Sequence, residues 1–171
     1  MSTYKGILGI VIFTLFAVLL FGCTSTQTDK ESLSKLSLLE QKYFMVNGYS
    51  SSVTTMNDYI SELSLLRSKA GGDSAKVIEA ELYSAEAFYY LNKTIIDSSS
   101  INSVQIKCSS SEVQNVISSI KLASEYSVKA VALINSLNSE KQKALRENQL
   151  QIVLGQQEQI TQIKKFFEEK C

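Results

Sequence analysis

The sequence predicts an all-α protein, an antiparallel helical bundle of about four helices that follows an N-terminal signal or anchor segment. The chain has 171 residues and contains no proline, whereas an average usage of about 5% would give roughly eight. Since proline interrupts helices, its absence favours long helices. Apolar residues also recur every three or four positions in four separate stretches, which is the spacing of a helix face. Together these observations indicate one helical domain.

Composition excludes several classes of function. The chain has no histidine, which is the usual general base near neutral pH and the commonest metal ligand. Its 17 Lys and Arg residues balance its 17 Asp and Glu residues, so the sequence lacks the basic patch that nucleic-acid binding requires. It also lacks the sequence motifs of nucleophilic catalysis and phosphate binding. We therefore expect no enzyme activity, no metal, no cofactor and no nucleic-acid partner.

Residues 1–22 have the pattern of a signal peptide. Lys5 precedes an apolar run from Ile7 to Phe21, and a polar stretch follows Cys23. As a helix, this run would be about 25 Å long, slightly less than a hydrocarbon core of about 30 Å. A permanent membrane span would therefore be tight, and the pattern favours a signal peptide.

The end of this run, Leu20 to Cys23, resembles the lipobox of prokaryotic membrane lipoproteins, in which a Leu, a small residue and a Gly or Ala precede an acylated Cys. Phe21 alone departs from that pattern. The resemblance covers the signal only and implies lipidation of Cys23, which would attach the chain to a membrane. An uncleaved signal anchor is the alternative, and both place the rest of the chain on the extracytoplasmic side. A polar tether, 23–31, then leads to the bundle domain, 32–171.

The first stretch of the bundle extends from Leu36 to Leu66. Its apolar residues are spaced at three and four positions, close to the 3.5-residue period of a coiled coil. One Gly and three Ser between Asn47 and Ser52 lower helix propensity, so the helix can kink or break there. A Gly cap followed by an Asp N-cap predicts a turn near 71–73.

The second stretch, from Ser74 to about Asp97, has a broad apolar face and is expected to be the most buried helix. A Ser-rich connection with few apolar residues follows at 98–110. Within it, Ser109 and Glu112 have the spacing of a capping box, which marks the start of the third helix.

The fourth helix follows a turn near 137–140. Its stripe, from Leu145 to Phe167, carries Gln149 and Gln156 near its centre. We therefore expect this helix to be the most solvated of the four or to await a partner.

The positions of Cys108 and Cys171 predict a structural disulfide. Cys108 precedes the third helix, Cys171 follows the fourth, and the midpoint between them falls in the turn near 137–140. Two antiparallel helices of equal length bring such ends together, and an extracytoplasmic compartment is oxidising. A reactive or intermolecular thiol at Cys171 is the alternative.

Aromatic residues in the second helix form a possible binding surface, because Tyr combines a large apolar ring with a polar tip. These residues are Tyr83, Phe88, Tyr89 and Tyr90. Half-buried edges of the core are the alternative interpretation. The same helix carries Glu79, Glu81 and Glu86, of which the first two point in opposite directions and cannot chelate a metal together. A solvated acidic face is predicted for these three.

These observations support two hypotheses of function. The first is a protein-interaction or structural module at the cell surface, with a protein partner or self-association. The coiled-coil-like first stripe and the polar centre of the fourth helix suggest it. The second is a small-ligand-binding or sensory domain with an aromatic-lined cavity between helices. A closed cavity near Phe88 and Tyr89 would favour the second, and a dry core with an exposed apolar stripe would favour the first.

Overall fold

A computed structural model describes residues 29–43, 45, 49–99, 101, 106–137 and 140–171, with the backbone alone for 140–145. These residues contain helices and no strand, so the predicted all-α bundle is confirmed. The described part of the chain has five helices: 29–42, α2 (Val53–Lys69), α3 (Gly72–Ser99), α4 (Ser111–Asn135) and α5 (Glu140–Lys170). The predicted signal peptide, 1–22, and the predicted lipidation site Cys23 lie outside the described residues.

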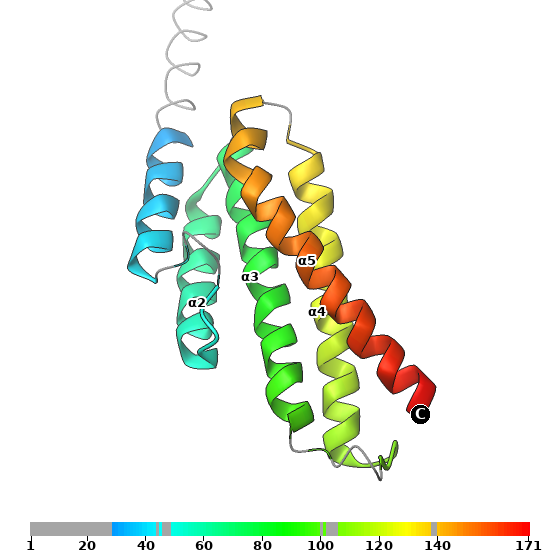
Figure 1. The fold of residues 1–171 in the computed structure, drawn as a ribbon. Coiled ribbons are helices and arrows are strands. Elements are labelled where there is room, and N and C mark those ends of the chain that lie inside the picture. The colour runs from blue at the N-terminus through cyan, green and yellow to red at the C-terminus, as the bar shows by residue number, and fades with distance from the viewer. Residues whose placement is uncertain (1–28, 44, 46–48, 100, 102–105, 138–139) are drawn as a thin grey trace, which may run out of the picture.

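Successive helices run in alternating directions along the bundle (Figure 1). α3 is central, since it contacts α2, α4 and α5, and its contact with α4 is the most extensive. α5 runs obliquely across α3 and α4 (Figure 1). The 28 residues of α3 give the bundle a length of about 42 Å at 1.5 Å per residue. The start of helix 29–42 and the end of α5 lie at opposite ends of it (Figure 1).

The first predicted stripe forms two helices rather than one, which accounts for five helices where about four were expected. α2 begins after Ser52, whose side chain accepts a hydrogen bond from the backbone N–H of Thr55 at 3.3 Å. Ser52 belongs to the stretch of low helix propensity and acts here as an N-cap. Met45, in the connection, still reaches the core and is 5% exposed.

The turn between α2 and α3 holds the start of the first helix. α3 opens at Gly72, whose φ of 55° favours glycine, so Asp73 lies in the first turn instead of at the predicted N-cap. The hydroxyl of Ser74 donates a hydrogen bond to the carboxylate of Asp29 at 2.7 Å. The first helix therefore begins inside the stretch predicted as a polar tether, 23–31, and its first turn is fixed to α3.

The start of α4 differs by one residue from the predicted capping box. Ser110, rather than Ser109, is the N-cap, and its side chain accepts a hydrogen bond from the backbone N–H of Val113 at 3.3 Å. Glu112 lies in the first turn, where a carboxylate interacts favourably with the helix dipole.

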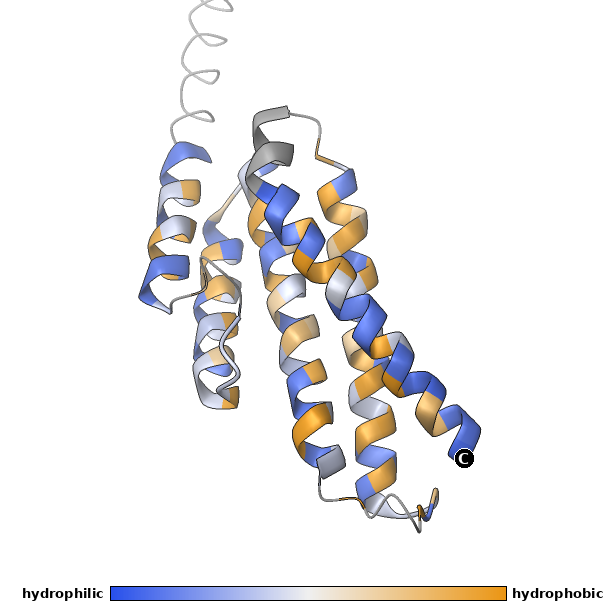
Figure 2. Cartoon of the chain, in the orientation of Figure 1, coloured by the Kyte–Doolittle hydropathy of each residue, from blue (hydrophilic) through white to orange (hydrophobic). Residues whose placement is uncertain are grey.

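The core consists of two hydrophobic clusters, and Figure 2 shows apolar residues on the facing sides of the helices. The first cluster joins the first helix, α2 and the first half of α3 and includes Leu36, Met45, Met56, Tyr59, Leu63, Leu66, Val77, Ile78, Ala85 and Leu137. The second joins the end of α3, α4 and α5 and consists of Leu91, Val113, Val116, Ile120, Ala123, Ile160 and Phe167. The apolar face predicted from Ser74 to about Asp97 ends earlier than expected, because Ile95 and Ile96 are 49% and 48% exposed.

Candidate functional site

The aromatic residues predicted as a binding surface lie on two different sides of α3. Tyr83 and Tyr90 face α4, where the ring centroid of Tyr126 lies 5.9 and 5.7 Å from theirs. Phe88 instead contacts Tyr49, with ring centroids 5.3 Å apart. Residues seven positions apart share a helix face, whereas residues two apart point about 200° from each other. The predicted surface is therefore divided.

The remaining member of the predicted surface, Tyr89, contacts Tyr90 edge to face, with ring centroids 5.1 Å apart. All four predicted aromatic residues are half-buried. They contact other rings of the bundle and thus have the environment of core edges, the alternative that the sequence left open.

Two ionisable side chains, Lys129 and Glu86, lie beside Tyr83 and Tyr126. The Lys129 ammonium is 5.5 Å from the ring centroid of Tyr83 and 5.1 Å from that of Tyr126, within the range of cation–π interaction. Glu86 is half-buried, and its Oε2 is buried and has no hydrogen-bond partner among the described residues. Burial raises the pKa of Glu86 to about 7, and Lys129 opposes the shift. The predicted solvated face does not hold for Glu86.

Glu81 also departs from the predicted solvated face, because it lies at the centre of a buried hydrogen-bond network. Its exposure is 1%. The hydroxyls of Tyr59 and Tyr49 donate hydrogen bonds to its Oε1 at 2.8 and 3.1 Å. Arg146 donates to its Oε2 at 3.0 Å. A carboxylate removed from water needs such donors, since its desolvation is otherwise costly.

Arg146 extends the network to the first helix. Its guanidinium also donates a hydrogen bond to Glu40 at 3.2 Å. Gln149, one turn further along α5, donates to the hydroxyl of Tyr49. The interactions join the first helix, the segment before α2, α2, α3 and α5. We call this set the Glu81 network: Glu40, Tyr49, Tyr59, Glu81, Arg146 and Gln149.

The electrostatics of the Glu81 network favour a fixed ion pair. Burial raises the pKa of Glu81, and Arg146 opposes that shift. Burial alone would lower the pKa of Arg146, but Glu81 and Glu40 outweigh it and raise this pKa. Burial also raises the pKa values of Tyr49 and Tyr59, so both phenols remain donors. The arrangement connects five segments of the chain and leaves the Glu81 carboxylate enclosed by its partners.

Helical spacing indicates that Glu81 and Arg146 are buried, although the predicted apolar stripes did not include them. Glu81 lies three residues after Ile78 and four before Ala85, and both neighbours are fully buried. A carboxylate inside such a stripe requires a buried partner. The fourth predicted stripe omitted Arg146, which precedes Gln149 by three residues and is 7% exposed. Helical spacing therefore indicates that Glu81 and Arg146 need buried partners, although it does not identify which residues pair.

The polar centre of α5 faces inward. Gln149 and Gln156 are 9% and 4% exposed, so the expectation of a solvated or waiting stripe is wrong for these two residues. Gln149 belongs to the Glu81 network, whereas both amide atoms of Gln156 lack a hydrogen-bond partner among the described residues.

The third predicted acidic residue, Glu79, forms an ion pair across the turn between α2 and α3. Its Oε2 accepts hydrogen bonds from Nη2 and Nε of Arg67 at 2.7 and 2.9 Å. This pair is partly exposed. The three glutamates of α3 therefore occupy three different environments, and the described residues contain no metal-binding group that includes them.

Cys108 and Cys171 are joined by a disulfide, with their Cα atoms 5.5 Å apart. The bond connects the residues before α4 to the end of α5 across a sequence separation of 63. Cys108 precedes α4 and Cys171 follows α5. Because α4 and α5 are antiparallel, both cysteines lie at the same end of the bundle, within reach of a disulfide. The structure thus places both predicted cysteines together.

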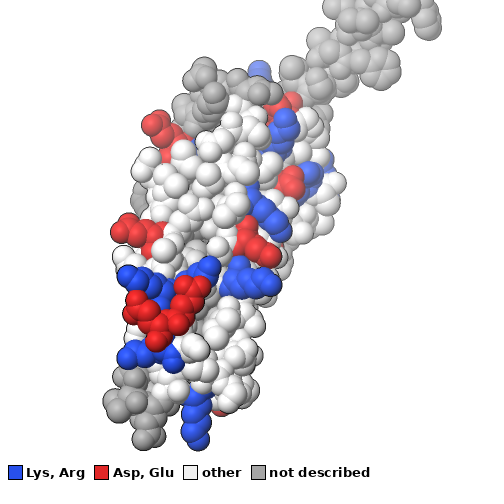
Figure 3. Space-filling model, turned by 90° about the vertical axis from the view of Figure 1, so that its right-hand side faces the viewer, with Lys and Arg blue, Asp and Glu red and all other residues white. Residues whose placement is uncertain are grey.

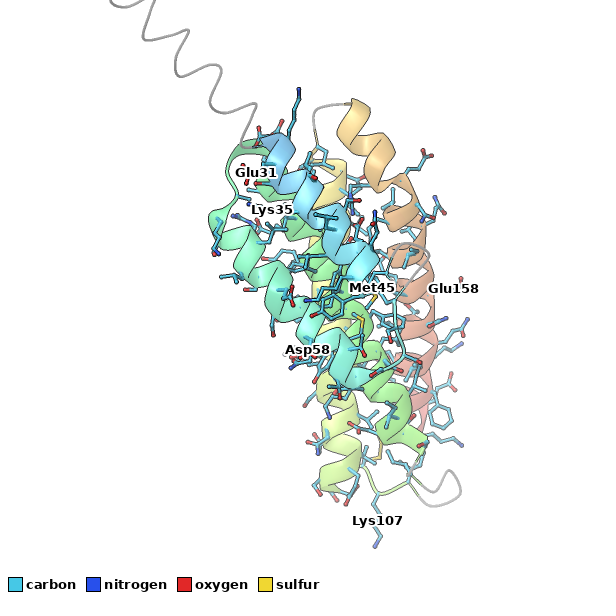
Figure 4. All side chains as sticks on the ribbon, turned by 90° about the vertical axis from the view of Figure 1, so that its left-hand side faces the viewer. Glu31, Lys35, Met45, Asp58, Lys107 and Glu158 are labelled. Carbon is cyan, nitrogen blue, oxygen red and sulfur yellow. A yellow bond between two sulfur atoms is a disulfide. The ribbon has the colours of Figure 1, made fainter. Side chains whose placement is uncertain are left out.

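A groove between the first helix and α2, which we call the proximal groove, has a volume of about 620 Å³. Leu38 and Leu65 flank it and are 61% and 56% exposed. Figure 4 shows Glu31 and Lys35 near the start of the first helix, and both line the groove. Its full lining is Glu31, Ser32, Lys35, Leu38, Leu39, Lys42, Glu62, Leu65, Leu66 and Lys69.

Two further grooves flank the C-terminal half of α5. The distal groove, of about 350 Å³, is lined by Ser98, Ile101, Ile106, Gln162, Ile163, Phe166 and Phe167. The other, of about 610 Å³, lies between α4 and α5 and is lined by Ile117, Ile120, Lys121, Ser124, Glu125, Lys164, Phe167, Glu168 and Cys171. Figure 3, which views the right-hand side of Figure 1, shows acidic and basic side chains next to one another on this face. The predicted aromatic residues of α3 are not part of these linings.

The described residues hold no group of three or more Cys, Asp or Glu side chains that could bind a metal ion. Within the same part of the chain, no helix is both long enough and apolar enough to cross a membrane. In comparisons with known proteins, no family model, curated protein or solved structure matches this chain.

Proposed function

We propose that the chain is a membrane-anchored extracytoplasmic protein whose helical bundle binds another protein at the distal groove. One observation carries this proposal: Phe166 is 41% exposed beside an apolar groove of about 350 Å³. Interfaces combine an apolar centre with a polar rim, and aromatic side chains dominate their binding energy.

The surroundings of Phe166 have this composition. Ile101, Ile106 and Ile163 provide the apolar walls of the groove, and its edge includes Gln162. On α5, Lys164 and Lys165 precede Phe166, while Glu168 and Glu169 follow it; they pair with each other at 3.6 and 3.8 Å and are largely exposed. A partner that fits has an apolar side chain for the groove and polar groups around it, without a strong net charge.

The position of the distal groove supports the proposed anchoring. The lipobox-like residues precede the first helix, and the distal groove lies at the opposite end of a bundle about 42 Å long. An anchor at one end leaves the other end accessible to a partner that is outside the membrane.

The alternative of an aromatic-lined ligand cavity receives less support. Tyr83 and Tyr90 each pack on Tyr126, with ring centroids 5.9 and 5.7 Å apart, and Phe88 packs on Tyr49. These rings contribute to core packing, whereas the grooves described above are lined by other residues.

Site-specific photocrosslinking in native membranes tests the binding proposal. A photoreactive side chain replaces Phe166 in the full chain, and a matched chain carries it at Val128 of α4, which is 58% exposed. We expect a discrete protein adduct from position 166 that is absent at position 128, and substitution of Ile163 by Glu should remove it. Equal adducts at both positions, or no adduct at 166, contradict the proposal.

Intact-mass measurement of the membrane fraction tests the anchor. We expect a chain that begins at acylated Cys23. A chain that retains residues 1–22 without lipid would identify a signal anchor instead.

A further inference from the structure

The proximal groove has the dimensions of one lipid acyl chain. Along the first helix it extends from Glu31 to Lys42, about 17 Å at 1.5 Å per residue. An acyl chain spans half of a hydrocarbon core of about 30 Å, which is about 15 Å. The groove volume of about 620 Å³ lies within the range of about 300 to 1,000 Å³ that is typical of small-ligand sites.

The chemistry of the groove suits an uncharged, apolar occupant. Leucines from both helices line it: Leu38, Leu39, Leu65 and Leu66. Four of the five charges at its rim already pair with each other, since Lys35 lies 2.6 Å from Glu31 and Lys42 lies 2.5 Å from Glu62, and the fifth, Lys69, lies in the last turn of α2. Rim charges that are neutralised internally do not require a charged ligand, and the long stems of the lysines extend the apolar walls.

One end of the groove lies at the start of the first helix, which follows the predicted lipidation site in the sequence. Glu31 and Ser32 line the end of the groove that is nearest the start of the first helix. The hydrogen bond between Asp29 and Ser74 holds that start in place at 2.7 Å. Residues 23–29 extend over at most about 20 Å, so an acyl chain attached to Cys23 can reach the groove and lie along it.

We infer that the proximal groove binds an acyl chain of the lipid on Cys23. The inference rests on the proposed lipidation and concerns a different surface from the distal groove. An acyl chain along the groove removes Leu38 and Leu65 from water, and the groove in turn shelters the lipid whenever the protein is outside a bilayer. When the acyl chain enters the membrane, the groove is vacated. The acyl chain is therefore buried either in the proximal groove or in the membrane.

Photoreactive fatty acids test this inference on the full chain. Bacteria that acylate lipobox cysteines are grown with a diazirine fatty acid, and the purified chain is photolysed after detergent removal and, separately, in lipid nanodiscs. Proteolysis and mass spectrometry then identify peptides that are joined to acyl-Cys23. We expect joined peptides that contain Leu38 or Leu65 in lipid-free buffer and at least tenfold fewer of them in nanodiscs.

Matched variants separate the groove from nonspecific contact. Leu38→Glu together with Leu65→Glu changes two exposed positions of the groove, and Val128→Glu changes an equally exposed position on α4. The groove variant should lose the joined peptides at least tenfold, while the Val128→Glu chain keeps them. Unfolding midpoints of both variants show whether the bundle is intact. Equal crosslinking in both variants overturns the inference.

The source of the acyl chain is settled by a Cys23→Ser chain from cells that received the same fatty acid. Labelling of the groove peptides that persists in this variant identifies a free membrane lipid and overturns the assignment to the chain's own lipid. An acylated Cys23 that is never joined to the groove refutes the inference and leaves the proposed anchor intact. An unlabelled Cys23 refutes both.

Discussion

Replacing Arg146 by Met should destabilise the bundle strongly, because it leaves the Glu81 carboxylate buried without its cation. Glu81 is 1% exposed, and removing one partner of a buried ion pair costs about 3 to 5 kcal/mol. For a chain of this size, each kcal/mol changes the thermal midpoint by about 2 to 4 °C. The expected decrease is therefore about 6 to 20 °C, measured by circular dichroism at pH 7.

Arg67→Met provides the matched control. Arg67 pairs with Glu79 at a similar distance of 2.7 Å, but this pair is partly exposed, and such pairs contribute about 0 to 1 kcal/mol. Acid should also relieve the Arg146→Met defect. Burial raises the pKa of Glu81, so its protonation below pH 4.5 removes the uncompensated charge, and the penalty grows as pH increases through the folded-state pKa. Equal losses in the two variants, independent of pH, would refute this account of the Glu81 network.

Four further measurements follow from individual features. Glu86→Gln should stabilise the chain by about 1 to 2 kcal/mol at pH 8, after allowance for the partial exposure of Glu86, and by almost nothing at pH 4. The reason is that the pKa of Glu86 is about 7 in the folded chain, which is higher than in the unfolded chain. Ionisation of Glu86 therefore destabilises the wild type only as the pH increases from the unfolded-state pKa toward 7. Urea unfolding at both pH values measures this difference. Gln156→Leu should raise the urea midpoint, because it removes a buried amide that has no hydrogen-bond partner in the described part of the chain and whose burial costs about 1 to 3 kcal/mol; a lower midpoint would show that the amide is satisfied. Leu63→Ala should cost about 2 to 5 kcal/mol, whereas Leu65→Ala, at a 56% exposed position, should cost less than about 1 kcal/mol; similar costs would contradict the assignment of Leu63 to the core and of Leu65 to the surface. Reduction of the disulfide should lower stability by about 4 kcal/mol in the loop-entropy model, and peptide mapping without reductant should recover its two cysteine peptides joined.

The helices and the disulfide could be predicted from sequence because both depend on regular spacing. A stripe of apolar residues identifies a helix face without knowledge of its partner. Similarly, Cys108 and Cys171 lie at equal distances from one turn, so antiparallel pairing alone brings them together. The interruption of the first stripe was visible as low helix propensity, but its outcome depended on Ser52 capping α2.

The Glu81 network and the division of the aromatic residues could not be obtained in the same way. Glu81 was assigned to solvent because its residue type is usually exposed, and only its place between Ile78 and Ala85 argued otherwise. Its partner Arg146 is 65 positions away, and composition does not single it out. The separation of Phe88 from Tyr90 follows from helical geometry. The prediction of one aromatic surface was wrong because it relied on adjacency in the sequence rather than on a shared helix face.

The disulfide has a mechanical consequence if the protein is attached at one end, as proposed above. If the chain is pulled at its first helix while a partner holds the distal groove, residues between Cys108 and Cys171 cannot lengthen, because the covalent bond closes them into a loop. Extension is then confined to the segment before Cys108, where the first helix and α2 are held by packing and by the Glu81 network. These two helices should yield first under load, while the covalently closed α4–α5 pair keeps Phe166 in place at the far end.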